Sequence, residues 1–225
     1  MRNLNVKNSG KGFKNLTLIL RLNVVQMLML NIHLGHTCKF LSIKIKPYLL
    51  GYRNNVYILN LVYTIYQFKL FCNILINLIS LRHKLLVVKD KDIFNVRKVL
   101  EVKNVFYYDK KWIGGVLTNY KKVRTSVKFK LENDSFNTLR VMRRTPSLVF
   151  FFDPDLSHWA LKEASNLGIP IAGIIDTNIK LLNFLNYPIV GNNKSFESVC
   201  LYFDVIKNAA IKGRQKELLK ILRII

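Results

Sequence analysis

The sequence predicts an α/β sandwich with a mostly parallel sheet, and three observations support this prediction. Short apolar runs alternate along the chain with longer segments of helical periodicity, which is typical of strands alternating with helices. Near the C-terminus, two apolar runs flank one helical segment through short loops, which specifies a right-handed parallel βαβ unit. Hydrophobic residues make up 50% of the 225 residues, enough for a large core.

The N-terminal quarter is expected to begin with a flexible basic arm. Residues 1–15 are polar and include two glycines, and residues 16–34 form an apolar run that predicts a helix ended by Gly35. Residues 36–55 contain a proline and a glycine and are predicted to be an irregular basic stretch. Residues 56–61 are predicted to form a strand.

The middle of the chain predicts one long helix, followed by two short strands around a second helix. Residues 62–80 have helical spacing. The residues that recur at this spacing are Leu70, Ile74, Asn77, Leu78 and Leu81. Apolar runs at residues 85–88 and 105–108 predict strands, and Asp92 can cap a helix between them that runs to about Lys103.

The C-terminal third contains the predicted βαβ unit. The continuous apolar run 147–152 predicts a strand covered on both faces, and residues 171–175 predict the next strand. Ser157 is expected to cap the intervening helix, which Gly168 and Pro170 end. The buried face of that helix is expected to contain Ala160, Leu161, Ala164 and Leu167.

After a last strand at residues 187–190, Asn193 or Ser195 is expected to open a final basic helix. Residues 16–225 are therefore predicted to form a single α/β domain, which carries a basic insertion at about residues 120–146.

The charge of the chain is strongly unbalanced. The net charge is +23, and the first carboxylate, Asp90, follows 13 Lys and Arg residues. Because like charges disfavour the compact state, an external polyanion is expected to neutralise them, either nucleic acid or an anionic membrane. Residues 16–30 are too short and too interrupted by polar residues for a membrane span, which needs roughly 20 apolar residues. A membrane-associated basic protein stays open as an alternative.

Polar residues follow the two strands of the βαβ unit, where open parallel sheets place their ligands. Asp153, Asp155 and Asp176 could serve a nucleotide- or metal-dependent enzyme. Against this alternative, Asp and Asn also form turns and helix caps in such loops, and no phosphate-binding or nucleophile motif accompanies them. We therefore expect no catalysis and no cofactor.

The histidines and cysteines give little support for a metal site. His33, His36 and Cys38 could provide three zinc ligands, but a fourth at zinc-site spacing is missing. Cys38, Cys72 and Cys200 are odd in number and widely spaced, which indicates free thiols in a reducing compartment.

Two basic segments with aromatic residues predict RNA binding. The first has Lys39, Lys44, Lys46 and Arg53 around Phe40, Tyr48 and Tyr52. The second, residues 110–144, has ten Lys and Arg residues against two acids and includes Trp112. Cations beside exposed aromatic rings suit a phosphate backbone with splayed bases. The main chain at Gly114 and Gly115 could also bind a phosphate.

Six ordered motifs resemble the bacterial-type ribosomal protein S-two family, over roughly residues 22–212. The resemblance rests on an opening signature, made of His33 to His36, Lys46-Pro47 and Gly51 to Asn54, and on five further strings: Trp112 to Asn119, Asp153 to Asp155, Glu163-Ala164 with Leu167 to Pro170, Ile175 to Asn178, and Tyr187 to Asn192.

The resemblance implies a Rossmann-like, flavodoxin-like three-layer α/β/α sandwich. It also implies a structural role in the small ribosomal subunit, bound to ribosomal RNA near the head–body junction and without catalysis. We expect neighbouring ribosomal proteins as further partners, and neither homo-oligomers nor membrane insertion. The residues expected to contact RNA are His33, His36, Lys39, Lys44, Lys46, Arg53, Asn54, Lys110, Lys111, Trp112, Gly114, Gly115, Asn119, Lys121, Lys122, Arg124 and Lys128.

The chain departs from the family pattern at two places. Members usually insert a long helical hairpin after the tryptophan motif, but only eighteen residues separate Val127 from Pro146 here. The family's Gly-Thr-Lys-like turn is replaced by residues 88–91. The shortened insertion and the bias toward Ile, Leu, Asn, Lys, Phe and Tyr favour a mitochondrial ribosome over a plastid one.

Overall fold

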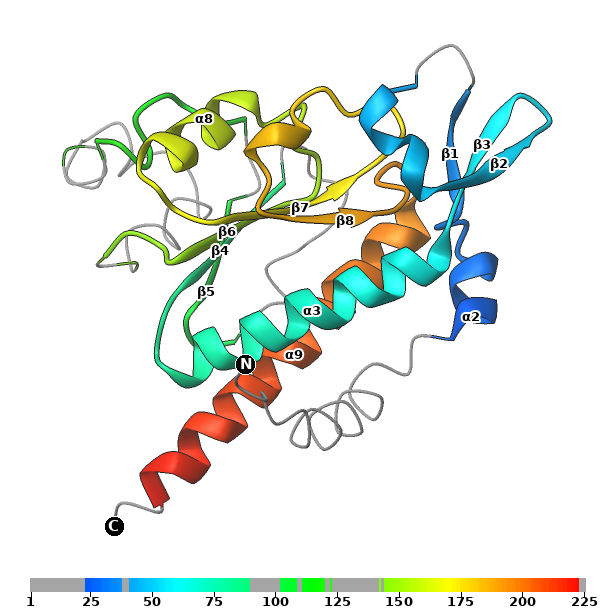
Figure 1. The fold of residues 1–225 in the computed structure, drawn as a ribbon. Coiled ribbons are helices and arrows are strands. Elements are labelled where there is room, and N and C mark those ends of the chain that lie inside the picture. Colours follow the sequence, from blue (N-terminus) through cyan, green and yellow to red (C-terminus); the bar gives the residue numbers. More distant parts are fainter. Residues whose placement is uncertain are drawn as a thin grey trace, which may run out of the picture.

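The computed structural model describes residues 23–37, 41–89, 102–108, 111–119, 122, 142 and 144–222. Over these residues the chain forms a five-stranded parallel sheet between two helical layers, with a three-stranded antiparallel sheet at one end (Figure 1). The predicted α/β sandwich is therefore confirmed. The expected arm, the helix predicted after Asp92 and most of the predicted insertion lie outside the described residues.

The parallel sheet matches the strand predictions closely. Its strands are β4 (Leu85–Val88), β5 (Val105–Tyr108), β6 (Leu148–Phe151), β7 (Ile171–Ile175) and β8 (Tyr187–Val190). In space they run β5-β4-β6-β7-β8, so the order reverses between β4 and β6, which is the flavodoxin-like arrangement. β4, β6 and β7 are buried along their whole length, as continuous apolar runs require.

The reversal point, where such folds commonly bind a ligand, is filled by side chains of this chain. Phe152, directly after β6, stacks on Phe203 with ring centroids 4.1 Å apart. The ammonium of Lys89, directly after β4, lies 5.6 Å and 5.5 Å from the centres of these two rings.

One face of the sheet is covered by α3 (Leu61–Ser80) and α9 (Phe196–Leu222), which lie side by side (Figure 1). Phe71 of α3 packs on Phe150 of the sheet, with centroids 5.0 Å apart. Gly213 lets the two helices approach closely, because a Cβ atom there would lie 2.7 Å from the Cβ of Ile79. This layer forms the larger part of the core.

The helix predicted over residues 62–80 is confirmed, but the residues noted at helical spacing do not mark its buried side. Leu70 and Leu81 are 47% and 60% exposed, and Asn77 is exposed as well. The residues that α3 buries are Leu61, Thr64, Phe68, Phe71, Cys72, Leu75, Ile79 and Ser80. Apolar residues occur on nearly every side of α3, so the helical period alone could not identify the side that faces the sheet.

The opposite face is covered by α8 (His158–Asn166) and by residues 112–117. Ala160, Leu161 and Ala164 are buried as predicted, but Leu167 is 42% exposed. The helix ends before Gly168, whose φ of +65° suits glycine.

The cap at the start of α8 differs from the prediction. Ser157 occupies the cap position but its side chain makes no capping hydrogen bond. Instead, Asp153 Oδ1 accepts a hydrogen bond from the Leu156 N–H at 3.3 Å, and so organises the turn before the helix.

The N-terminal part is more regular than predicted. The helix α2 (Val24–Met29) is short, and Gly35 lies in the strand β1 (Leu34–Thr37) rather than at a helix end. The stretch predicted to be irregular contains the 3₁₀ helix η2 (Ile43–Tyr48) and β2 (Leu49–Arg53), which forms a hairpin with β3 (Val56–Leu59). Asn54 and Asn55 have φ values of +50° and +61°, and a two-residue hairpin turn of this kind favours Asn.

The small sheet, in the order β1-β3-β2, packs beyond the carboxyl ends of β7 and β8. Ile45 and Leu59 form a buried cluster with Ile175 and Val190, which end those strands. The Ser42 N–H donates a hydrogen bond of 2.8 Å to the Thr177 carbonyl. The basic N-terminal segment is thereby fixed to the edge of the main sheet where the strands have their carboxyl ends, the edge at which such sheets bind ligands.

Candidate nucleic-acid interface

The first group of predicted RNA contacts lies on the small sheet and on η2. Lys44 and Lys46 are exposed on η2, and Arg53 and Asn54 are exposed at the hairpin turn. Tyr52, next to them, is 73% exposed. No acidic residue occurs before Asp90, so no carboxylate in this unit offsets its cations. We call Lys44, Lys46, Tyr52, Arg53 and Asn54 the hairpin surface.

His36 joins the small sheet to the main sheet. Its Nδ1 lies 3.0 Å from Asp176 Oδ2, and its main-chain N–H donates a 2.8 Å hydrogen bond to Thr177 Oγ1. The hydrogen bond with Asp176 raises the pKa of His36, although partial burial opposes this. The absence of a side chain at Gly35 permits the contact, since a Cβ atom there would lie 2.4 Å from Thr177 Cγ2.

His33 contributes little charge to the surface, because partial burial lowers its pKa. Its ring therefore stays neutral at neutral pH. The zinc hypothesis needs Cys38, which lies outside the described residues, and His36 is already engaged by Asp176.

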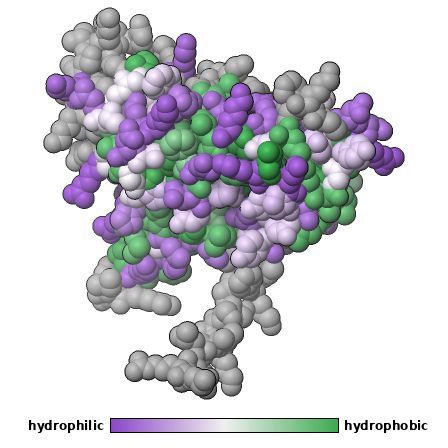
Figure 2. All heavy atoms as spheres, turned by 45° about the horizontal axis from the view of Figure 1, so that its top comes forward, coloured by the Kyte–Doolittle hydropathy of each residue, from purple (hydrophilic) through white to green (hydrophobic). Residues whose placement is uncertain are grey.

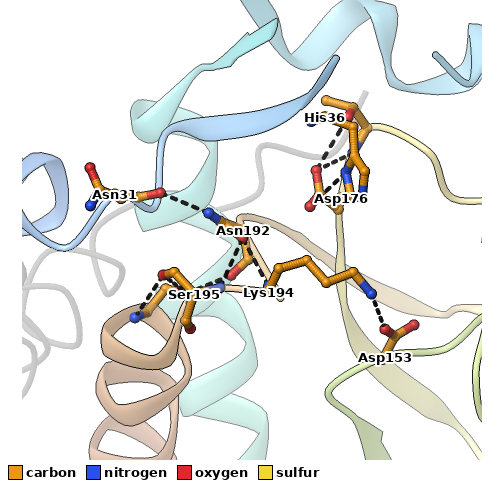
Figure 3. A network of polar contacts seen from close by, with 9 residues as sticks. Asn31, His36, Asp153, Asp176, Asn192, Lys194 and Ser195 are labelled. Atoms are coloured by element: carbon orange, nitrogen blue, oxygen red, sulfur yellow. Dashed lines mark hydrogen bonds and ion pairs between the residues drawn. The ribbon is translucent and has the colours of Figure 1, made fainter. Parts of the chain in front are cut away.

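The carboxylates that follow β6 and β7 are bonded to other groups of the protein, as Figure 3 shows for Asp153 and Asp176. Asp176 is 2% exposed and accepts hydrogen bonds from the Thr177 N–H and hydroxyl. Asp153 Oδ2 lies 2.6 Å from the Lys194 ammonium. Asp155 accepts hydrogen bonds from the N–H groups of Lys180 and Leu181, and burial raises its pKa. Asp153 and Asp155 therefore organise turns and loops, as the turn and helix-cap interpretation predicts in part, whereas the N-cap residue of α8 is Ser157.

Asn192 extends this network to the N-terminal segment. Its side chain donates to the Asn31 carbonyl at 3.1 Å, and its Oδ1 accepts from the N–H groups of Lys194 and Ser195 (Figure 3). The loop before α9 is thus bonded both to the N-terminal segment and, through Lys194, to the loop after β6.

The second group of predicted contacts surrounds a buried carboxylate. Glu163, on α8, is 9% exposed. Its Oε1 accepts hydrogen bonds from Trp112 Nε1–H at 3.1 Å and from the Gly115 N–H at 2.7 Å. Its Oε2 accepts from the N–H groups of Leu117 and Thr118 at 2.9 and 3.3 Å. The turn forms an anion-binding site that the protein's own glutamate occupies.

This geometry corrects two expectations. The Gly115 N–H was expected to bind a phosphate, but it is bonded to Glu163. Trp112 was expected to be an exposed aromatic, but its side chain is 7% exposed and packs on Tyr108 with centroids 4.8 Å apart. A buried indole that donates its N–H to Glu163 stabilises the turn and offers no face to a base.

Other residues of the second group face outward. Lys111, Gly114, Asn119 and Lys122 are exposed. Lys39, Lys110, Lys121, Arg124 and Lys128 lie outside the described residues, so their expected RNA contacts stay predictions.

The charge is unevenly distributed over the described helices. α2 and α3 together carry a single charged residue, Lys69, while their outer faces expose apolar side chains. Figure 2, which brings the top of Figure 1 forward, shows hydrophilic side chains interspersed with hydrophobic ones. Because α2 and α3 expose apolar side chains and carry one charge, their outer face is poorly suited to a phosphate backbone.

Among the described residues, α3 has the length and apolar composition of a membrane-spanning helix. Phe68, Phe71 and Leu75 nevertheless bury one of its sides against α9 and the sheet, as in the core helix of a globular domain. Cys72 lies in the same core, where burial raises the pKa of its thiol to about 12, and both Cys72 and Cys200 are free.

Comparison with known proteins identifies the family. The family described as ribosomal protein S2 matches residues 27–141 and 128–213, most of the chain. The small ribosomal subunit protein uS2 of Shewanella piezotolerans is 32% identical over 223 aligned residues, which cover 85% of this chain and 91% of that protein. The uS2 protein of Pseudoalteromonas atlantica is 33% identical with the same coverage. This chain belongs to the ribosomal protein S2 family.

Membership accounts for the architecture and for the lack of a catalytic arrangement. The resemblance inferred from the six motifs is confirmed, and with it the Rossmann-like sandwich. The family is structural and not enzymatic, so the enzyme alternative based on Asp153, Asp155 and Asp176 is excluded. A role in the small ribosomal subunit follows at the level of the family.

Proposed function

We propose that this chain is a structural component of a mitochondrial small ribosomal subunit and binds its ribosomal RNA near the head–body junction. One observation carries the proposal: the hairpin surface has three exposed cations and an exposed tyrosine within a segment that contains no acid. The nearby carboxylate of Asp176 already contacts His36 of the same chain. A surplus of cations in this arrangement suits RNA phosphates.

Fewer of the predicted RNA contacts in the second basic segment lie among the described residues. Lys111 and Lys122 are exposed beside the turn that Glu163 holds. We assign RNA contact to these two side chains and to the exposed Asn119, and we assign Trp112 and Gly115 to the support of the turn.

The α2–α3 face is proposed to contact neighbouring ribosomal proteins. Val62, Tyr66 and Leu70 of α3 are 69%, 59% and 47% exposed, and Met29 of α2 is 77% exposed. Exposed apolar residues with almost no charge fit a protein surface better than a polyanion.

The mitochondrial assignment rests on the shortened insertion and the biased composition, while the relatives named above are bacterial. The alignment to the Shewanella piezotolerans protein spans 223 positions but includes only 85% of this 225-residue chain, so the relative has residues where this chain has none. The two matched segments of the family meet at residues 128–141, within the predicted insertion.

Sucrose-gradient sedimentation of a mitochondrial extract tests the proposal. The chain is expected to sediment with the small subunit at moderate salt, and to move to light fractions after ribonuclease treatment. A soluble matrix enzyme serves as the control and stays light throughout. Recovery of the chain only in light fractions at every salt concentration contradicts a ribosomal role. Co-sedimentation with plastid ribosomes instead contradicts the mitochondrial assignment.

A further inference from the structure

A hollow of about 750 Å³ lies beside the hairpin surface, beyond the carboxyl ends of β6 and β7. Its walls come from the loop after β6, the loop after β7 and the segment that leads into η2. Its volume falls within the range of roughly 300–1,000 Å³ that small-ligand sites occupy. Lys89, Phe152 and Phe203 fill the reversal point of the sheet, whereas this hollow, also beyond the carboxyl ends of the strands, is open.

We propose that this hollow binds one unstacked nucleotide of an RNA strand, with its phosphate at the rim and its base inside. This inference rests on the proposed function, because the RNA strand would belong to the small ribosomal subunit.

The rim carries the charge that a phosphate needs. Lys44 and Lys180 are both exposed at the hollow, on η2 and on the loop after β7. The Lys44 ammonium is held by Asn183 Oδ1 at 2.5 Å, which fixes the side chain at the rim. Two cations at the rim of one hollow can contact one phosphate or two successive phosphates.

The interior suits a base. Ile179 is 3% exposed and gives an apolar floor, to which Leu41 and Leu181 contribute. Asn178 and His158 line the same hollow and carry both donors and acceptors, so they can meet the polar edge of a base.

Asp155 is the acidic residue of the lining, and it offsets only part of the rim charge. Its carboxylate accepts hydrogen bonds from the N–H groups of Lys180 and Leu181 at 3.2–3.3 Å. This arrangement holds the loop after β7 in place and so keeps Asn178 and Ile179 at the hollow. Two lysines against one such carboxylate leave the lining cationic.

The test measures binding of the full-length chain to a fluorescent transcript of the cognate small-subunit ribosomal RNA. Ser42→Trp fills the hollow without removing charge, and its affinity is expected to fall about tenfold with an unchanged salt slope. Asn178→Ala is expected to lower affinity about threefold to tenfold, the worth of one or two hydrogen bonds to a base. Lys180→Gln is expected to reduce the slope of log affinity against log salt by about 0.7–0.9.

Lys220→Gln, an exposed lysine on α9 in the opposite helical layer, is the matched charge control and is expected to leave both quantities unchanged. Thermal unfolding verifies that each variant folds. If Ser42→Trp unfolds the protein, Asn178→Ala and Lys180→Gln still test whether the hollow binds a nucleotide of the RNA.

Two outcomes overturn the inference and leave the proposed function standing. The first is normal RNA binding by all three folded hollow variants. The second is that free adenosine or uridine monophosphate binds the hollow, while 4-thiouridine-substituted RNA forms no crosslink to residues 155–158 or 178–181. This result would make the hollow a site for free nucleotides. Failure of the wild-type chain to bind ribosomal RNA at all contradicts the proposed function itself.

Discussion

Two segments of this chain share a basic, aromatic and glycine-containing sequence, yet the structure uses them differently. In the turn at residues 112–118, the distinctive residues point inward and surround Glu163. On the hairpin surface, the cations and Tyr52 point outward, and no acid is present in the segment. A distinctive string of residues can thus maintain a fold, while the proposed RNA contacts are ordinary exposed cations elsewhere on the surface.

The largest expected effect comes from removing the carboxylate that holds the turn. Glu163→Ala leaves the buried Trp112 N–H and the main-chain N–H groups of Gly115 and Leu117 without their acceptor. Because each unsatisfied buried donor costs about 1–3 kcal/mol, the free energy of unfolding is expected to fall by about 3 kcal/mol or more. Urea unfolding of the purified protein measures this loss.

Glu197→Ala is the matched control, since Glu197 is exposed in the first turn of α9. It is expected to change stability by less than about 0.5 kcal/mol. A Glu163→Ala protein as stable as the wild type shows that the turn does not depend on this carboxylate.

The next effect concerns the cations of the hairpin surface. Replacing Lys44, Lys46 and Arg53 together by Gln is expected to reduce the slope of log affinity against log salt by about 2–3, because each phosphate contact contributes roughly 0.7–0.9. Fluorescence anisotropy with a small-subunit ribosomal RNA transcript, over a series of KCl concentrations, provides the slope.

A variant of equal net charge separates local contact from overall attraction. It replaces three exposed lysines elsewhere: Lys103, Lys162 and Lys220. If this control reduces the slope as much as the hairpin variant does, the hairpin surface is not the RNA contact.

Two aromatic substitutions sharpen the contrast between the segments. Tyr52→Ala is expected to weaken RNA binding by about 1–3 kcal/mol, the worth of one stacked base, with little change in stability. Trp112→Phe is expected to lower stability by about 1–2 kcal/mol, because it removes a donor to Glu163, and to leave RNA affinity unchanged. The reverse pattern, with Trp112→Phe losing RNA and Tyr52→Ala losing stability, contradicts the assignment of inward and outward roles.

The smallest effect is the pH dependence of the link between the two sheets. Asp176 raises the pKa of His36 in the folded chain, so the stabilisation is fully present below the unfolded pKa of about 6.5 and is lost as pH rises through the folded value. The difference in unfolding free energy between wild type and His36→Gln is therefore expected to be larger at pH 5.5 than at pH 8.5, by at most about 1 kcal/mol. A difference that grows with pH shows that the pair does not act through a protonated histidine.

Much of the main sheet could be predicted from sequence, and the reasons are local. Buried parallel strands such as β4, β6 and β7 are short, continuous apolar runs, and Gly168 with Pro170 marks a helix end. The face of α3 could not be predicted, because its apolar residues occupy several sides and only contact with α9 and the sheet selects one. The hairpin was missed although Asn54 and Asn55 are typical of a two-residue turn.

The site was harder to predict than the fold, because it depends on partners far away in sequence. Glu163 lies 51 residues from Trp112, and Asp176 lies on a different sheet from His36. Neither pairing has a signal in the local sequence. Charge could be predicted better, since the absence of acids before Asp90 is visible in the sequence and the exposed lysines of η2 agree with it.

Ultraviolet crosslinking and mass spectrometry of intact small subunits isolated from mitochondria would show which residues touch RNA. RNA crosslinks are expected on residues 43–54, with Tyr52 among them, and none on Trp112. Crosslinks on Trp112 with none on residues 43–54 contradict this expectation.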